Sequence, residues 1–231
     1  PRLTTLEAGR EPYKREWFEP HFVATPSMNS LCKESLKALE NHVEIILGCE
    51  VGSIEKIDIG NASCRWRVFG KQLDSTQEAL GEFDWILSAA PSAQTEALFT
   101  NTAFNHLDRL RDAVHLPCFS LMLGFDAPPK LSVDLATVKE SSVALIVANA
   151  SKPGRAASHS LLVHSDNHWA RKNFEGDRAE IQQQLIDETW SLLNLDAASI
   201  VHTELHGWRY AKTEIATEED FLLDDARQLA A

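Results

Sequence analysis

The sequence predicts a mixed α/β protein, an α/β class with an α+β-like sheet in which parallel and antiparallel strands combine. Three observations lead to this class. Residues 28–42 carry apolar side chains at intervals of three and four, which is the spacing of a helix with one buried stripe. Residues 43–69 instead alternate apolar and polar side chains, as strands do. Trp85–Leu87 and Val143–Ala148 are short, continuously apolar runs, typical of strands covered on both faces.

The helices follow from local start and stop signals. Ser27 precedes the helix over residues 28–42, and its apolar stripe includes Leu31 and Cys32. Asp177 with Glu180 resembles a capping box and begins a helix that extends to about Leu193. Two shorter helices are predicted over residues 94–99 and 104–114.

The strands are bounded by glycine, proline and asparagine turns. A turn at Gly60–Asn61 returns residues 64–69 against residues 43–59, so these segments form a β-meander. Pro128–Pro129 ends a strong strand that begins at Pro117. The remaining predicted strands are residues 3–7, 21–24, 83–90, 133–138, 143–148, 161–164 and 200–210. This order suggests two lobes joined near residues 99–106 and again near Tyr210.

Composition and charge exclude some classes of binding partner. The 231 residues, 44% hydrophobic and 24% charged, suffice for one large domain or two small ones. A net charge of -12 argues against nucleic acid and anionic membranes. The sequence contains no signal peptide and no apolar run long enough to span a bilayer, so we expect a cytoplasmic protein.

The four cysteines, Cys32, Cys49, Cys64 and Cys118, are far apart and form no Cys-x-x-Cys pair. Neither a zinc knuckle nor a dithiol motif is therefore predicted. Cys32 and Cys118 have apolar neighbours, and we expect both in the core.

Two polar clusters follow predicted strands and are candidates for ligand binding. The first comprises Asn149, Ser151 and Lys152, which present amide, hydroxyl and amine groups directly after residues 143–148. In the second, residues 206–212, aromatic and basic side chains alternate. Trp208 and Tyr210 would then lie on one face of the strand and Arg209 on the other.

Cations beside aromatic planes suit a flat, anionic heteroaromatic ligand. A strand whose arginine pairs with surface acids explains the second cluster equally well from the residues alone.

Other chemistries have weaker support. His164 and His168, like His202 and His206, are four residues apart, but neither pair has the His-Glu-x-x-His pattern, so we predict no metal site. No Gly-x-Ser-x-Gly elbow is present for a serine hydrolase. Neither Gly-x-Gly-x-x-Gly nor a Walker sequence occurs, so a pyrophosphate would have to be bound by other residues.

Five segments, in order, resemble the bacterial renalase-like flavoproteins of the wider flavin amine oxidase group. They are His-Phe-Val-Ala-Thr-Pro-Ser-Met-Asn-Ser-Leu at 21–31, Pro-Cys-Phe-Ser-Leu-Met-Leu-Gly-Phe at 117–125, Ala-Asn-Ala-Ser-Lys-Pro-Gly-Arg at 148–155, Leu-Val-His-Ser-Asp-Asn-His-Trp at 162–169 and His-Gly-Trp-Arg-Tyr-Ala at 206–211.

This resemblance implies a substrate domain and a partial FAD-binding domain. Residues 1–25 and 98–210 would form the substrate domain. Residues 26–97, with the meander, and the returning segment 211–231 would belong to the FAD domain.

The resemblance also implies roles for individual residues. Val51, Ala90 and Pro91 match positions along FAD. The substrate-binding residues would be Asn149, Ser151, Lys152, Trp208, Arg209 and Tyr210. Lys152 and Arg209 would supply positive charge, and Trp208 and Tyr210 would form a wall of the flavin-facing pocket. Asn149 would orient an amide of the substrate.

The glycine-rich unit that begins such proteins is missing, and so is their closing Gly-Asp segment. We therefore expect the intact protein to be an FAD oxidoreductase that passes hydride from dihydro-NAD(P) isomers to flavin and then electrons to O₂. We expect this piece to bind FAD poorly or not at all and to be inactive. The alternatives are a flavin amine oxidase or dehydrogenase of another substrate, and a non-catalytic binding or dimerisation domain. The expected partner is a small-molecule substrate, with a homodimer as an option.

Overall fold

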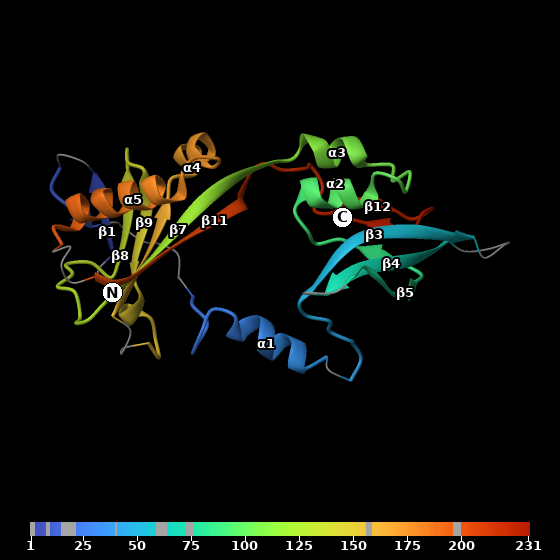
Figure 1. Ribbon diagram of the computed structural model, residues 1–231, viewed down its shortest axis with the longest axis horizontal. Helices are drawn as coiled ribbons and strands as arrows, with labels where there is room; N and C mark the ends of the chain where they lie inside the picture. The colour runs from blue at the N-terminus through green and yellow to red at the C-terminus, as the bar shows by residue number, and fades with distance from the viewer. Residues whose placement is uncertain are drawn as a thin grey trace. The chain divides into compact units, whose positions relative to one another are not determined.

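The computed structural model describes residues 3–7, 10–14, 22–39, 41–58, 64–72, 76–155, 159–195 and 200–231 (Figure 1). The chain forms two compact units. The first unit is Pro1–His42 with Leu116–Lys212, and the second unit is Val43–His115 with Thr213–Ala231.

The predicted domains also alternate along the chain. Their boundaries were predicted after residues 25, 97 and 210, whereas the two units change after residues 42, 115 and 212. The assignment of these domains to substrate and FAD stays a prediction.

A seven-stranded sheet organises the first unit, in the order β11-β7-β10-β9-β8-β1-β2. β1 is parallel to β8, whereas β7, β10, β9 and β8 are successively antiparallel, so the sheet is mixed, as the sequence predicts. The strands are β1 (Leu3–Glu7), β2 (Tyr13–Lys14), β7 (Val114–Phe125), β8 (Leu135–Lys139), β9 (Val143–Ala148), β10 (Ser160–Ser165) and β11 (Ile200–Ile215).

Two helices, α4 (Asn167–Asn173) and α5 (Arg178–Leu193), cover one face of this sheet (Figure 1). Phe119, Val163 and Leu185 are fully buried in the core between the helices and the strands. Because side chains alternate along a strand, Leu162 and His164, on either side of Val163, point to the opposite face of the sheet. Both are half-buried, so this face is only partly covered.

Local capping explains both helices. Asp177 Oδ1 accepts hydrogen bonds from the amides of Ala179 and Glu180 at 2.9 and 3.0 Å, which confirms the predicted start of α5. The helix ends at Leu193, and the residue that caps it, Asn194, has a left-handed φ of 52°. Asp166 caps α4 in the same way by accepting from the amide of Trp169 at 2.8 Å, although α4 was not predicted.

The second unit holds the predicted meander, formed by β3 (Cys49–Asp58), β4 (Cys64–Gln72) and β5 (Glu78–Phe83). A second small sheet has the order β12-β13-β6, with bounds Leu223–Asp224, Leu229–Ala230 and Ile86–Leu87. β13 lies parallel to β6. Helices α2 (Ser92–Phe99) and α3 (Leu107–Asp112) complete a core around Trp66, Phe99 and Leu229.

A buried carboxylate ties the end of the chain into this unit. Asp224 accepts hydrogen bonds from the Asn105 amide at 3.0 Å, the Arg227 amide at 3.2 Å and the Arg227 guanidinium at 3.0 Å. The carbonyl of Arg227 in turn accepts from Trp66 Nε1 at 2.9 Å. The C-terminal strands are therefore anchored to both the meander and the segment before α3.

The prediction for residues 28–42 was wrong in two respects. The helix α1 spans only Ser30–Lys37 and contains no buried residue. Leu31 is 68% exposed, and Cys32 is exposed as well, whereas Cys118 is buried as expected. Leu31, Cys32 and Leu36 lie on this helix as predicted, whereas Met28 and Leu39 lie outside it. Burial also requires an opposing surface, and the described residues do not bury this stripe.

Three strand predictions also need correction. Residues 43–47 and 22–24 form no strand, and the strand predicted over 83–90 is reduced to Ile86–Leu87. Leu87 is 74% exposed, so this run is not covered on both faces. The polar β5 was missed because its sequence lacks apolar alternation. The predicted turn at Gly60–Asn61 and residue His21 lie outside the described residues.

None of the described helices has the length and apolar character needed to cross a membrane.

Candidate functional site

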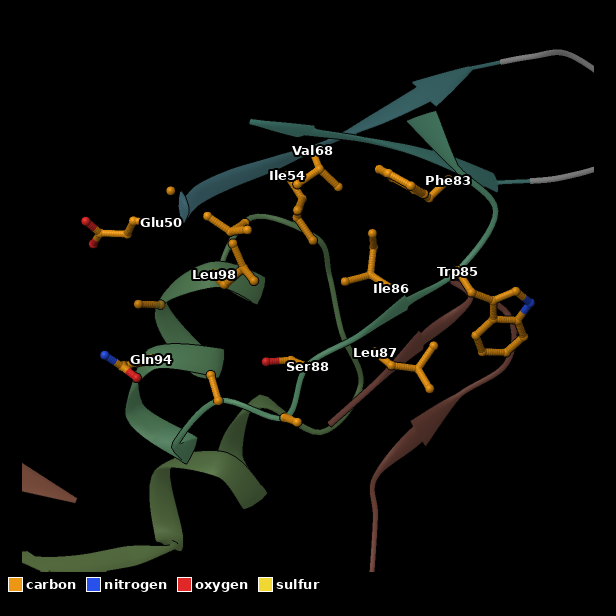
Figure 2. Close-up of a pocket in the computed structure, with 15 residues that line it drawn as sticks. Glu50, Ile54, Val68, Phe83, Trp85, Ile86, Leu87, Ser88, Gln94 and Leu98 are labelled. Atoms are coloured by element: carbon orange, nitrogen blue, oxygen red, sulfur yellow. The ribbon is translucent and has the colours of Figure 1, made fainter. Parts of the chain in front are cut away.

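A cavity of about 730 Å³ opens in the second unit between the meander, β6 and α2 (Figure 2). We call it the meander cavity. Its lining residues are Glu50, Val51, Gly52, Ile54, Val68, Phe83, Trp85, Ile86, Leu87, Ser88, Ala89, Ala90, Gln94, Ala97 and Leu98.

The interior of the meander cavity is largely aliphatic. Figure 2 shows Ile54 and Val68 projecting from the strands toward Ile86, while Glu50 and Gln94 lie at one side. Ser88 Oγ is held 2.7 Å from Thr95 Oγ1 at the start of α2. An apolar cavity of this volume with few polar groups is typical of a small-molecule site.

Two of the three predicted cofactor residues, Val51 and Ala90, line this cavity, and Pro91 follows Ala90 as the residue before α2. The pairing of β3 with β4 shifts register between Val51 and Ser53, which marks a β-bulge at the cavity wall. Bulges of this kind often occur beside binding sites. Whether these residues contact a cofactor stays a prediction.

A second cavity, of about 620 Å³, lies within the first unit and is called the sheet-edge cavity here. Its walls come from β7, β9, β10, α4 and β11. The lining residues are Cys118, Ala144, Leu145, His164, Ser165, Asn167, Trp208, Tyr210, Ala211 and Lys212.

A chain of hydrogen bonds supports one wall of the sheet-edge cavity. Ser120 and His164 are directly opposite each other on β7 and β10, and Ser120 Oγ lies 2.9 Å from His164 Nδ1. Trp208 Nε1 donates to the same Ser120 Oγ at 3.1 Å. The ring of His206 packs edge-on against Trp208 with centroids 4.3 Å apart. These contacts fix the orientations of the His164 and Trp208 rings.

Burial shifts the pKa values of His164 and Cys118 in this wall, and of Lys152 near it. It lowers the pKa of His164, with a further contribution from the charge of Lys152, so the imidazole is neutral at pH 7. Burial also lowers the pKa of Lys152, and the charge of Arg155 adds to this. The pKa of the Cys118 thiol is raised, again mainly by burial, so Cys118 is not an activated nucleophile.

The predicted residues of β11 divide between the two faces of the sheet, as the period of a strand requires. Trp208 and Tyr210 line the sheet-edge cavity. Arg209 instead forms an ion pair with Glu175 at 2.9 Å, and its guanidinium lies 4.6 Å from the centre of the Phe174 ring. The arginine thus has the surface partner that the alternative explanation from sequence required.

The polar side chains of the loop after β9 form hydrogen bonds within the loop and to neighbouring backbone. It begins with a 3₁₀ turn, η1 (Asn149–Ser151), and Asn149 Oδ1 accepts from Arg155 at 3.2 Å. Ser151 donates to the carbonyl of Ala148 at 2.7 Å and lines a different cavity, of about 250 Å³. Neither Asn149, Ser151 nor Lys152 lines the sheet-edge cavity, although Lys152 influences His164 electrostatically. Their role in substrate binding stays a prediction.

Sequence reasoning missed several residues of the sheet-edge cavity and its supporting wall. Ser120 and His164 are polar positions within otherwise apolar strands, which was the available signal, but their pairing depends on strand register. Asn167, which donates to the carbonyl of Pro117 at 2.9 Å, lies on the unpredicted helix α4. Within the described part of the chain, no group of three or more His, Cys, Asp or Glu side chains is arranged to hold a metal ion.

The fold is that of a two-unit mixed α/β protein. No protein-family model matches the chain. Its fold is similar to the 2.06 Å crystal structure of a protein from Exiguobacterium sp. 255-15, provisionally identified as a protoporphyrinogen oxidase. The match has a TM-score of 0.62 at 16% sequence identity and covers 83% of this chain. The chain spans 41% of the length of that protein, so the likeness concerns the fold of less than half of it.

Proposed function

We propose that this chain is part of an FAD-dependent oxidoreductase. The observation that carries the proposal is the fold similarity to the Exiguobacterium protein, whose name is that of an oxidase. The five sequence segments that resemble renalase-like flavoproteins also support it. Three of them contribute lining residues to the sheet-edge cavity, among them Cys118, His164 and Trp208.

In this proposal the meander cavity receives the adenine end of FAD. Its aliphatic lining and its volume fit a flat aromatic ring. Of the residues that line it, all within the described part, Glu50 alone is charged, so the cavity offers no cation to a pyrophosphate. The residues present therefore fit only part of the cofactor, and the pyrophosphate needs donors from outside these residues.

The sheet-edge cavity is then the substrate side. Trp208 and Tyr210 provide aromatic surfaces, and Lys212 places a cation among the lining residues. These features suit a flat ring with an anionic portion, in agreement with the renalase-like proposal that dihydro-NAD(P) isomers are the substrates. Arg209, paired with Glu175 on the other face of the sheet, receives no role in this site.

FAD, when bound, supplies the hydride acceptor. The residues of this chain bind and orient the substrate and exclude water through the aliphatic side chains around it. A neutral His164 and a protonated Cys118 add no charge to the sheet-edge cavity at neutral pH, so Lys212 is the charged residue of its described lining.

The test compares the 231-residue chain with the product of the full reading frame of its gene, which this proposal expects to be longer. We expect the longer protein to purify with a stoichiometric flavin spectrum and dihydro-NAD isomers to bleach it anaerobically. Bleaching by an amine, with no response to these isomers, would instead favour the amine oxidase alternative. A longer protein without flavin would refute the proposal and leave the non-catalytic binding domain.

The chain alone should bind FAD at least about a hundredfold more weakly than the longer protein, because the pyrophosphate contacts are missing. Flavin fluorescence quenching measures this difference. A stoichiometric yellow spectrum from the chain alone would contradict the expected division of the cofactor site.

A further inference from the structure

We propose that His164 is the specificity-determining residue of the sheet-edge cavity and that Ser120 holds it in the tautomer protonated on Nε2. In this state His164 donates one hydrogen bond to a carbonyl oxygen on a flat aromatic ligand. The identification of that ligand as the substrate rests on the proposed function, whereas the donor itself follows from the contacts in the first unit.

The tautomer follows from counting protons along the wall. An indole N–H can only donate, so Ser120 Oγ accepts the bond from Trp208. Ser120 has one hydroxyl proton and is 4% exposed, and within the described residues its second side-chain hydrogen-bond partner is His164 Nδ1. When Ser120 donates to Nδ1, all three groups are satisfied. The reverse arrangement would leave the buried hydroxyl proton without an acceptor, which is unfavourable.

A neutral imidazole carries a single proton. Since Nδ1 accepts from Ser120, this proton must be on Nε2. Burial and the nearby Lys152 both favour the neutral ring, so the same state holds at pH 7. His164 is a lining residue of the cavity, which leaves Nε2–H as its group for a ligand. The wall thus offers a directed donor with no positive charge.

The surroundings define the class of ligand. Trp208 and Tyr210 offer ring surfaces, and Ala144 and Leu145 add aliphatic ones, so a flat ring is favoured. A carbonyl oxygen on that ring matches the donor at His164. Lys212 is exposed at the cavity, and repulsion between like charges disfavours a cationic ligand there. The geometry therefore fits an aromatic carboxamide or a similar carbonyl-bearing ring.

The tautomer can be measured directly. In the 231-residue chain labelled with ¹⁵N-histidine, two-bond ¹H–¹⁵N spectra at pH 7.5 distinguish a protonated from an unprotonated ring nitrogen. We expect His164 to show a protonated Nε2 and an unprotonated Nδ1, and Ser120→Ala to convert it to a mixture of both tautomers. A wild-type His164 protonated on Nδ1, or unchanged by Ser120→Ala, would overturn the proposal.

Ligand preference is tested with nicotinamide and with 3-methylpyridine, which has the same ring without the carbonyl. We expect nicotinamide to bind at least about tenfold more tightly, with a shift at His164 Nε2–H on binding. His164→Leu should abolish this preference. His164→Gln should retain most of it, since its amide N–H lies near the position of Nε2. His202→Leu, a substitution on the same sheet outside the cavity, is the matched control and should change nothing.

Equal affinities for the two probes in the wild-type chain would also overturn the proposal. The spectra and the affinities of the wild-type chain decide the matter even where a His164 variant fails to fold. The two hypotheses fail separately. A donor preference in this chain together with a longer protein that lacks flavin would leave the inference intact and refute the proposed function. A longer protein that holds flavin, together with a chain that shows no preference for nicotinamide, would support the proposed function and refute the inference about His164.

Discussion

Replacement of Asp224 by alanine should destabilise the second unit while leaving the first unit unchanged. The Asp224 side chain is 1% exposed, and its carboxylate accepts from two backbone amides and one guanidinium. The substitution removes all three hydrogen bonds, but the three donors differ in how much free energy each loss costs. The amide of Arg227 keeps a second acceptor, the backbone carbonyl of Asp224 at 3.2 Å. The guanidinium of Arg227 is 32% exposed and can turn to water.

The amide of Asn105 is the group left without its partner. An unsatisfied, partly buried amide costs about 1–2 kcal/mol, and loss of the half-exposed ion pair adds about 1 kcal/mol. We therefore expect a total of about 2–3 kcal/mol. Asp224→Asn, which keeps one acceptor oxygen, should cost about 1 kcal/mol.

Hydrogen exchange read by mass spectrometry resolves the two units. A loss of about 2–3 kcal/mol lowers the protection of amides in β4 and β13 by about 30- to 150-fold. Amides in β7 and β10 are the internal control. The neighbouring exposed residue Asp225, replaced by alanine, is the matched control variant. A change of less than twofold in β13, or an equal loss in both units, would refute the reasoning.

Cys32 should react with a maleimide at least about a hundredfold faster than Cys118, because Cys118 is buried and its thiol pKa is raised; equal rates by peptide mapping would contradict this. The depressed pKa of His164 contributes stability that is full above its unfolded value of about 6.5 and is lost as the pH falls through the folded pKa. Urea midpoints should therefore fall less on acidification in His164→Phe than in the wild type, and parallel curves would disprove the assignment. Leu185→Ala should cost about 2–5 kcal/mol in urea unfolding, since Leu185 is fully buried on the core-facing side of α5, whereas Val201→Ala, at a 66% exposed position, should stay within about 0.5 kcal/mol. Similar losses for both would show that this core is not packed as described.

The parts of the fold that the sequence predicts are those with local causes. α5 was predicted with its start because Asp177, its cap and its apolar periodicity are all within one segment. β9 was predicted with its bounds because Val143–Ala148 is a compact apolar run between turns. β12 and β13 were not predicted, because each is two residues long and exists only through pairing with distant parts of the chain.

The candidate site divides in the same way. Alternation along one strand was enough to place Trp208 and Tyr210 on the face opposite Arg209. The contact between Ser120 and His164 depends on the register of β7 with β10, which no single segment encodes. The resemblance pointed to Val51 and Ala90, which the structure brings to one cavity, but residues 149–152 are not among the lining residues of the sheet-edge cavity.

The parallel pairing of β13 with β6 has a consequence for the biogenesis of the protein. Leu229 pairs with Ile86, so the small sheet cannot form until the ribosome has synthesised nearly all the residues between them. At usual elongation rates this takes on the order of ten seconds. During that interval the strand beside the meander cavity lacks its neighbour, and Trp66 lacks the carbonyl of Arg227. A chain terminated before residue 222 would stay in this state permanently and become a substrate for chaperones and proteases.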